Sequence, residues 1–200
     1  MALFGSLARH VATESALKTL ATDAGGAEGG LSRDTVSDYL DVLGRLMLVE
    51  DQPAWAPHLR SRATLRKSPK RHLADPSLAA AALAATPDRL MGDLNAFGQM
   101  FESLVVRDLR VYAQVNHYRD SYGTEVDAIV QLRDGRWGAF EVKLGTGRID
   151  EAAASLLRFS EALDQERSGS PAVLGVITGT GLGYRRPDGV VVIPIGELGP

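Results

Sequence analysis

The sequence contains no cysteine, which excludes disulfide bonds, thiolate metal ligands and cysteine nucleophiles from its chemistry. It also contains no apolar run that approaches the ~20 residues needed for a membrane-spanning helix. The N-terminal stretch lacks the uninterrupted apolar block of a signal peptide. We therefore expect a cytoplasmic protein, and the frequent use of alanine, glycine and arginine indicates a bacterial origin.

Several catalytic signatures are missing as well. No G-x-x-x-x-G-K-[ST] loop occurs, so these residues are not expected to bind or hydrolyse ATP. No G-x-S-x-G turn supports a serine hydrolase, and the 4 histidines are scattered without the spacing of metal ligands. What remains is a soluble composition, 44% hydrophobic and 24% charged, over 200 residues. That length suits one medium domain or two small ones.

The formal net charge of −3 does not suggest a general attraction to nucleic acid. The exception is the stretch between Gln52 and Ala74, which contains basic residues and no acid. Its basic residues are Arg60, Arg62, Arg66, Lys67, Lys70 and Arg71. A run of this kind is either a solvated loop or a surface that binds the phosphates of DNA or RNA, and it is the segment of this chain best suited to the second role.

Residues 1–57 show the pattern of a winged helix-turn-helix. The pattern predicts two helices and a short strand, at 3–22, 32–47 and 48–51. The second helix would be the recognition helix, yet its acids outnumber its bases: Asp34, Asp38 and Asp41 against Arg33 and Arg45. Acids at that place repel the phosphates that supply most non-specific affinity. The pattern therefore favours a packing or protein-contact module over a DNA reader.

Residues 58–93 are predicted to form a basic linker or ribbon followed by an alanine-rich helix, with Asp75 as N-cap and Pro76 as first helical residue. Residues 94–200 then alternate between helical and strand patterns. The predicted elements are a helix at 95–113, strands at 115–119, 124–132 and 136–144, a helix at 149–166, and strands at 172–178 and 189–195. This order predicts an α/β (α+β) fold with a mixed central sheet and helices on its faces.

The stretch EVDAIVQLRDGRWGAFEVKLG, residues 125–145, places charged side chains on two predicted strands. Glu141 and Lys143 are two residues apart and share one face of their strand, opposite the apolar face that we expect a helix to cover. A two-residue turn would direct Asp127 of the preceding strand to the wrong face. A three-residue loop or a β-bulge would set Asp127 opposite Glu141, with their β-carbons ~5 Å apart. We predict the second register.

Two neighbouring carboxylates beside an ammonium suit Mg²⁺ or Mn²⁺, because such ions take one or two carboxylates together with waters and phosphate oxygens. Lys143 would then orient or deprotonate a water, or stabilise charge on a phosphate. Glu102, on the helix predicted at 95–113, is the candidate for an additional acid. The alternative for the same residues is a solvent-facing ion pair, which contributes little.

Four ordered segments resemble the motifs of domain of unknown function 4143: SPKRHLADPSLAAAAL (68–83), GQMFESLVVRDL (98–109), HYRDSYGTEVDAIV (117–130) and FEVKLG (140–145). The series Glu102, Asp127, Glu141-x-Lys143 also resembles the PD-(D/E)XK nuclease superfamily, which has a restriction-endonuclease-like αβββαβ core. The resemblance implies catalytic roles for Asp127, Glu141, Lys143 and Glu102, with the three acids binding metal. It also implies the C-terminal part of an AAA-type ATPase, in which this domain follows a winged helix.

Three functional hypotheses follow from the sequence. The first is a metal-dependent phosphodiesterase acting on DNA or RNA, favoured by the four-residue series. The second is a catalytically inactive nuclease-fold module that binds nucleic acid or protein for an ATPase missing from this chain, favoured by the acidic C-terminal half. The third is a transcription regulator that uses the winged helix, which the aspartates of its recognition helix disfavour.

Overall fold

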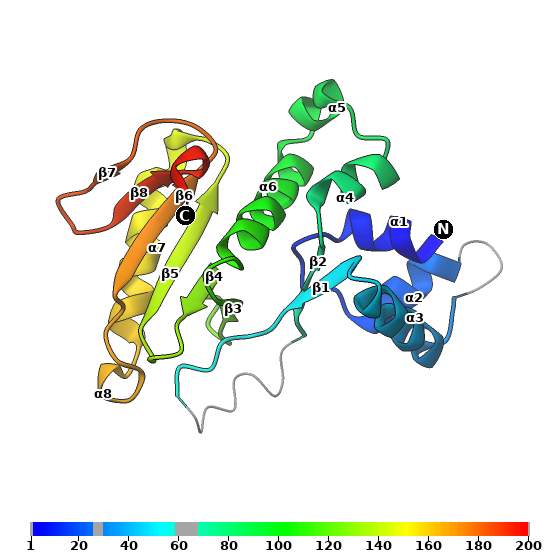
Figure 1. Ribbon diagram of the computed structural model, residues 1–200, viewed down its shortest axis with the longest axis horizontal. Helices are drawn as coiled ribbons and strands as arrows, with labels where there is room; N and C mark the ends of the chain where they lie inside the picture. The colour runs from blue at the N-terminus through cyan, green and yellow to red at the C-terminus, as the bar shows by residue number, and fades with distance from the viewer. Residues whose placement is uncertain (1, 26–29, 59–67, 200) are drawn as a thin grey trace. The chain divides into compact units, whose positions relative to one another are not determined.

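The computed structural model describes residues 2–25, 30–58 and 68–199. These residues form two compact units, each with its own core (Figure 1). The first unit contains residues 2–25, 30–52 and 68–104, and the second contains residues 53–58 and 105–199. The division differs from the predicted boundaries at 57 and 93, because residues 68–104 contact the N-terminal helices rather than forming a connecting segment.

The first unit is mainly helical. Its elements are α1 (Ala2–Arg9), α2 (Leu17–Gly25), α3 (Arg33–Arg45), β1 (Val49–Gln52), β2 (Lys70–Leu73), α4 (Pro76–Ala82), α5 (Pro87–Gly92) and most of α6 (Leu94–Leu109). The single helix predicted at 3–22 is wrong, because the chain leaves the helical path after α1. There Ala12 has a positive φ of 58°, and the next residue, Thr13, forms an isolated β-bridge with Arg71 of β2.

Local capping explains where two of these helices begin. The Ser32 hydroxyl accepts a hydrogen bond of 3.0 Å from the amide of Thr35 at the start of α3. The Asp75 carboxylate accepts one of 2.8 Å from the amide of Ser77, and Pro76 is the first residue of α4, as predicted. The predicted basic linker or ribbon contains a regular strand, because β2 pairs antiparallel with β1.

The second unit is built on a six-stranded mixed sheet. Its elements are β3 (Gln114–Arg119), β4 (Glu125–Gln131), β5 (Trp137–Lys143), α7 (Ile149–Ala162), α8 (Gln165–Ser168), β6 (Val173–Thr178), β7 (Tyr184–Arg185) and β8 (Val191–Pro194). The strand order is β3-β4-β5-β6-β8-β7. β5, β6 and β8 run parallel, and the remaining pairs are antiparallel. The predicted mixed sheet is confirmed, and the two-residue β7 is an addition to it.

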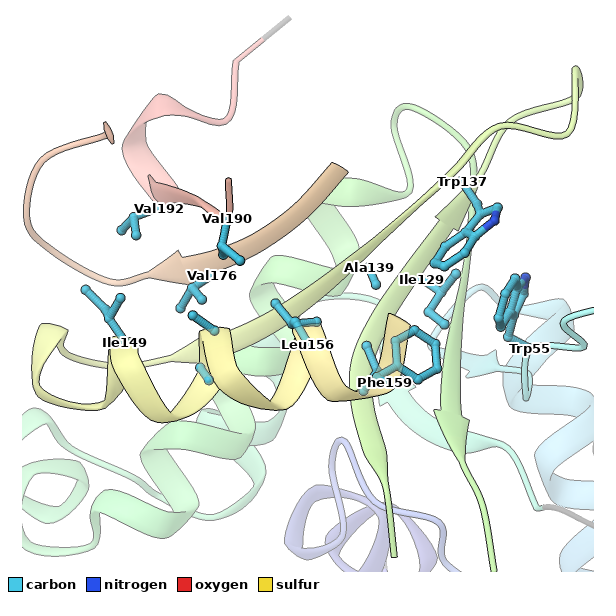
Figure 2. Packing of buried hydrophobic residues seen from close by; sticks show 13 residues of the cluster. Trp55, Ile129, Trp137, Ala139, Ile149, Leu156, Phe159, Val176, Val190 and Val192 are labelled. Carbon is cyan, nitrogen blue, oxygen red and sulfur yellow. The ribbon is translucent and has the colours of Figure 1, made fainter. Parts of the chain in front are cut away.

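Helix α7 covers one face of this sheet with its apolar side (Figure 2). The helix residues in the core are three or four positions apart, as an amphipathic helix requires: Ile149, Ala152, Ala153, Leu156 and Phe159. They pack against Ile129, Trp137, Ala139, Val176 and Val192 of the strands. The predicted helix at 149–166 is interrupted after Ala162, and α8 follows as a separate turn.

Residues 53–55 lie along the free edge of β3 and complete this core. The amide of Trp55 donates a hydrogen bond of 2.7 Å to the carbonyl of His117, and the amide of His117 donates one of 3.0 Å to the carbonyl of Pro53. The Trp55 ring lies 4.8 Å from the Trp137 ring, centroid to centroid, and both are labelled in Figure 2. This segment therefore covers part of an otherwise unpaired strand edge.

Candidate functional site

The site is positioned by the hairpin that joins β4 to β5. The amide of Leu132 donates a hydrogen bond of 2.8 Å to the carbonyl of Arg136, which leaves a loop of Arg133, Asp134 and Gly135 between them. Gly135 has a φ of 88°, the left-handed conformation that a three-residue hairpin loop of this kind needs at its last position. The predicted three-residue loop is confirmed.

This loop sets the register of the whole hairpin. Ala128 pairs with Phe140 and Ile129 with Ala139, so the next position sets Asp127 opposite Glu141. The predicted register is therefore confirmed. A side chain two positions further along a strand shares its face, so Lys143 joins the same cluster from β5.

The three side chains contact one another directly. The Lys143 ammonium donates a hydrogen bond of 2.7 Å to the Glu141 carboxylate and lies 3.6 Å from the Asp127 carboxylate. The amide of Val142 donates a hydrogen bond of 2.9 Å to the same Asp127 carboxylate. The side chains of Lys143, Asp127 and Glu141 are only 20%, 14% and 9% exposed. We call these three residues the acid–lysine cluster.

The cluster lies on a different face of the sheet from the one expected. We predicted that a helix covers the face of β5 opposite Glu141 and Lys143. Trp137 and Ala139 share the face of these two residues, and both pack against α7. The face that carries the cluster is therefore the face that α7 covers: the first half of β5 contributes to the core and the second half carries the charges.

Burial changes the acid–base behaviour of the cluster. Burial, together with the neighbouring carboxylate of Asp127, raises the pKa of Glu141 to about 7. Burial acts to lower the pKa of Lys143, but the charges of Asp127 and Glu141 outweigh it and raise the pKa above its ordinary value. Lys143 is thus a cation at neutral pH, whereas Glu141 can gain or lose a proton there.

The cluster forms one wall of a pocket of about 290 Å³. Gly123 and Glu125 line it from the start of β4, and residues on and just before α7 line the opposite side. Those residues are Arg148, Glu151, Ala152, Ser155 and Arg158. The pocket therefore combines acids and bases from the hairpin and from the helix.

The contribution of α7 to the pocket was not predicted from the sequence. Its lining residues recur at spacings of three and four from Arg148 to Arg158, so they form one stripe of a helix. This stripe is visible in the sequence beside the apolar stripe of the same helix. The periodicity alone does not show that the polar stripe faces the acid–lysine cluster, because the direction of the stripe depends on how α7 packs on the sheet.

Glu102, the fourth predicted site residue, lies in the first unit and has a partner there. Its carboxylate accepts a hydrogen bond of 2.7 Å from the ammonium of Lys70. The two side chains are 15% and 4% exposed, so this is a buried ion pair. Glu102 therefore has a structural role in the first unit, independently of any role in metal binding.

The predicted basic surface also differs from the structure where it can be compared. Lys70 is buried, and so is Arg71, whose guanidinium donates to the carbonyl of Ser15. A buried, paired cation does not present its charge to a polyanion, so an exposed basic surface is not found at these two positions. The other four predicted positions, Arg60, Arg62, Arg66 and Lys67, lie outside the described residues.

The donor set of the acid–lysine cluster fits a hard divalent cation. Over residues 2–25, 30–58 and 68–199, no group of three or more His, Asp and Glu side chains is placed to hold a metal. Two carboxylates are sufficient for Mg²⁺ or Mn²⁺, which completes its shell with waters and phosphate oxygens. Asp127 and Glu141 are two adjacent carboxylates, and a bound cation would offset the burial and mutual repulsion that raise the pKa of Glu141.

Fold and site together define a mixed α/β protein with a carboxylate–lysine pocket at one end of its sheet. The family described as Domain of unknown function (DUF4143) matches residues 97–198, just over half of the chain, and the chain belongs to this family. A second family, Domain of unknown function (DUF8612), matches residues 1–89. The predicted resemblance is thus confirmed for the part that contains the pocket, whereas the segment at 68–83 falls in the other match.

No curated protein and no solved structure matches this chain. In the part of the chain that the structure describes, no helix is long and apolar enough to cross a membrane.

Proposed function

We propose that this protein is a metal-dependent phosphodiesterase acting on DNA or RNA, with a restriction-endonuclease-like core in its second unit. The observation that carries the proposal is the pairing of Asp127 with Glu141 across β4 and β5, with the Lys143 ammonium in contact with both carboxylates. Two acids and a lysine so placed can hold a divalent cation and a water for metal-assisted hydrolysis of a phosphodiester.

Asp127 and Glu141 would hold Mg²⁺ or Mn²⁺, which supplies Lewis-acid polarisation of the phosphate and of a bound water. Lys143 has a raised pKa and remains protonated, so it acts as a cation. In that state it orients a water by hydrogen bonding, or stabilises negative charge on the phosphate, rather than accepting a proton. Without a bound metal, Glu141 has a pKa of about 7 and can exchange a proton at neutral pH, whereas metal binding would require its ionised form.

We further propose that the first unit is a winged helix-like module, and that the whole chain corresponds to the C-terminal part of an AAA-type ATPase acting in the cytoplasm. The helix–strand order of the first unit supports the winged-helix proposal. The acids Asp34, Asp38 and Asp41 of α3 are exposed, which favours protein contact over DNA binding and speaks against a transcription regulator.

The second candidate function is a nuclease-fold module that is catalytically inactive and serves an ATPase by binding nucleic acid or protein. A specific observation favours it: Lys143 already forms ion pairs with both carboxylates of the acid–lysine cluster, and Glu102 is paired with Lys70. Under this reading the cluster is a structural ion-pair network, and nuclease folds do not by themselves imply cleavage.

The deciding experiment is cleavage of labelled single-stranded and duplex DNA and RNA by the full chain with Mg²⁺ or Mn²⁺. Asp127→Ala and Lys143→Ala are compared with the parent protein and with Asp134→Ala, which removes an exposed acid of the hairpin loop. We expect cleavage that both cluster variants abolish and Asp134→Ala retains. No cleavage, or cleavage that survives both cluster changes, contradicts the phosphodiesterase and leaves the binding module.

A further inference from the structure

We infer that the pocket of the second unit takes a single-stranded nucleic acid, with Tyr122 stacking on an unpaired base and Arg158 contacting a backbone phosphate. This inference rests on the proposed function for its class of ligand and adds the strand state and two positioning residues. Neither residue belongs to the acid–lysine cluster, and neither stood out in the sequence as a site residue.

Tyr122 is the most exposed large hydrophobic side chain of the described residues, with 94% of its surface accessible. It lies in the loop between β3 and β4, directly before Gly123, which lines the pocket. The ring contributes nothing to the core, and its exposed face is free to stack on the apolar face of a ligand.

The backbone of this loop is held in place. The Asp120 carboxylate accepts a hydrogen bond of 2.8 Å from the amide of Tyr122 and one of 2.9 Å from the amide of Thr124. Gly123 has a φ of 90°, and the amide of Asp120 donates to the carbonyl of Thr124 at 3.0 Å. The loop therefore holds the backbone of Tyr122 next to Gly123, which lines the pocket, and an ordered backbone lowers the entropic cost of binding.

Arg158 lines the pocket from α7. Its side chain is exposed and makes no hydrogen bond or ion pair with another described residue. Arg148 lines the same pocket but donates hydrogen bonds of 2.9 and 2.7 Å to the two carboxylate oxygens of Glu151. Arg158 is thus the arginine of this pocket whose guanidinium is available for a bidentate contact with a phosphate.

The combination of an exposed ring and an available arginine favours a single strand over a duplex. In a duplex the faces of the bases are covered by their neighbours, so Tyr122 would find no face on which to stack. In a single strand each base has an accessible face. Proteins that bind single strands without sequence preference combine aromatic rings that stack on the bases with cationic side chains that contact the phosphate backbone. The pocket of about 290 Å³ is also small, which suits one nucleotide step of a flexible chain.

The test is a binding measurement by fluorescence anisotropy on the full chain, in EDTA and in Ca²⁺. The probes are labelled oligomers of about 16 nucleotides, as single-stranded DNA, single-stranded RNA and duplex DNA. The variants are Tyr122→Ala, Tyr122→Phe and Arg158→Ala. Matched controls are Tyr184→Ala and Arg133→Ala, which remove an exposed tyrosine and an exposed arginine of the same unit that do not line the pocket.

We expect single strands to bind more tightly than the duplex. Tyr122→Ala weakens single-strand binding by about 5- to 150-fold, whereas Tyr122→Phe, which keeps the ring, stays within about twofold. Arg158→Ala reduces the magnitude of the negative slope of log K against log salt by about 0.7 to 1, and both controls behave as the parent. The DNA and RNA arms show which of the two single strands is preferred.

Duplex binding as tight as single-strand binding, a Tyr122→Ala protein that binds as the parent, or no binding to any oligomer overturns the inference. These outcomes are separate from the failure of the proposed function. Binding that depends on Tyr122 and Arg158 without cleavage in Mg²⁺ or Mn²⁺ keeps the single-strand site and removes the phosphodiesterase. Cleavage that depends on Asp127 and Lys143 but not on Tyr122 keeps the phosphodiesterase and removes the single-strand site.

Discussion

The Lys143 ammonium donates a hydrogen bond of 2.7 Å to the carboxylate of Glu141, two residues before it on β5. Both side chains are largely buried, with 20% and 9% of their surfaces exposed. A second carboxylate, that of Asp127, lies 3.6 Å from the same ammonium. One buried cation therefore compensates two acids, and the electrostatic balance of the pocket depends on it.

Replacing Lys143 with methionine should destabilise the protein more at pH 8 than at pH 5. At pH 8 the variant leaves two adjacent carboxylates without their cation, and we expect a loss of about 1–3 kcal/mol in the free energy of unfolding. At pH 5 Glu141, with its pKa of about 7, is protonated and the loss is smaller. Urea unfolding in EDTA at the two pH values measures the difference.

The matched control is Arg136→Met, which breaks an ion pair on the exposed hairpin loop, where Asp134 and Arg136 are 51% and 68% exposed. Surface pairs of this kind contribute little, so we expect a change below about 1 kcal/mol at both pH values. An equal loss for Lys143→Met at pH 5 and pH 8 would show that its charge is not what stabilises the cluster.

Replacing Glu141 with glutamine should stabilise the metal-free protein at pH 8. The pKa of Glu141 is raised in the folded state, from 4.5 to about 7, so ionisation costs the folded state more than the unfolded state. The parent therefore loses stability as pH rises from about 4.5 to about 7, and above pH 7 the full cost, on the order of 3 kcal/mol, remains.

Glutamine cannot ionise, so the Glu141→Gln protein should lack this part of the pH dependence. We expect the two proteins to be equally stable near pH 4.5 and to diverge towards pH 8, as measured by urea unfolding at several pH values in EDTA. The charged groups around Glu141, namely Asp127, Lys143 and Arg148, are unchanged in the comparison. Parallel pH profiles for the two proteins would contradict the raised pKa.

Divalent metal should raise the melting temperature of the parent protein through the acid–lysine cluster. An ion that binds only the folded state stabilises it by about 2.7 kcal/mol at 100 times its dissociation constant. We expect a rise with Mg²⁺ or Mn²⁺ in a thermal unfolding assay, and no rise for Asp127→Asn. Asp134→Asn, on the exposed loop, should respond as the parent does. An unchanged melting temperature of the parent at millimolar metal argues against a metal site.

Glu102 and Lys70 should behave as a structural pair in a double-mutant cycle. Lys70→Met or Glu102→Gln alone removes one member of this buried ion pair, which costs about 3–5 kcal/mol. The double variant should lose less than the sum of the two, because the second change removes the charge that the first one left without this ion pair. Urea unfolding of the four proteins at pH 7 gives the coupling energy.

The same variant tests the other role predicted for Glu102. If the Glu102→Gln protein keeps its stability but loses the metal-dependent rise in melting temperature, Glu102 contributes to metal binding. Loss of stability with an intact metal response would assign it to the first unit alone, as the hydrogen bond to Lys70 indicates.

Short-range features of the sequence were enough to predict the hairpin that carries the cluster. The side chains of a strand alternate between faces, and the glycine at 135 permits the loop that sets Asp127 opposite Glu141. The N-caps at Ser32 and Asp75 were also predictable, because each needs only a side chain and an amide two or three residues away.

The sequence misled where a long-range contact competes with a local preference. The helical pattern at 3–22 is interrupted where Thr13 bridges Arg71, a residue far along the chain. Lys70 and Arg71 follow a basic run and were expected on the surface, but β2 buries both. In each case a tertiary contact outweighs what neighbouring residues favour.

By itself, therefore, the sequence determined the order of the main helices and strands of residues 94–200, the turn at Gly135 and the shared face of Asp127, Glu141 and Lys143. These depend on backbone geometry and on residues close together in the chain. Only the tertiary structure decided that α7 covers the face of the cluster, that Arg158 and Gly123 border one pocket, and that Glu102 pairs with Lys70. Those relations depend on packing between elements that are distant in the chain, and no local pattern encodes which faces meet.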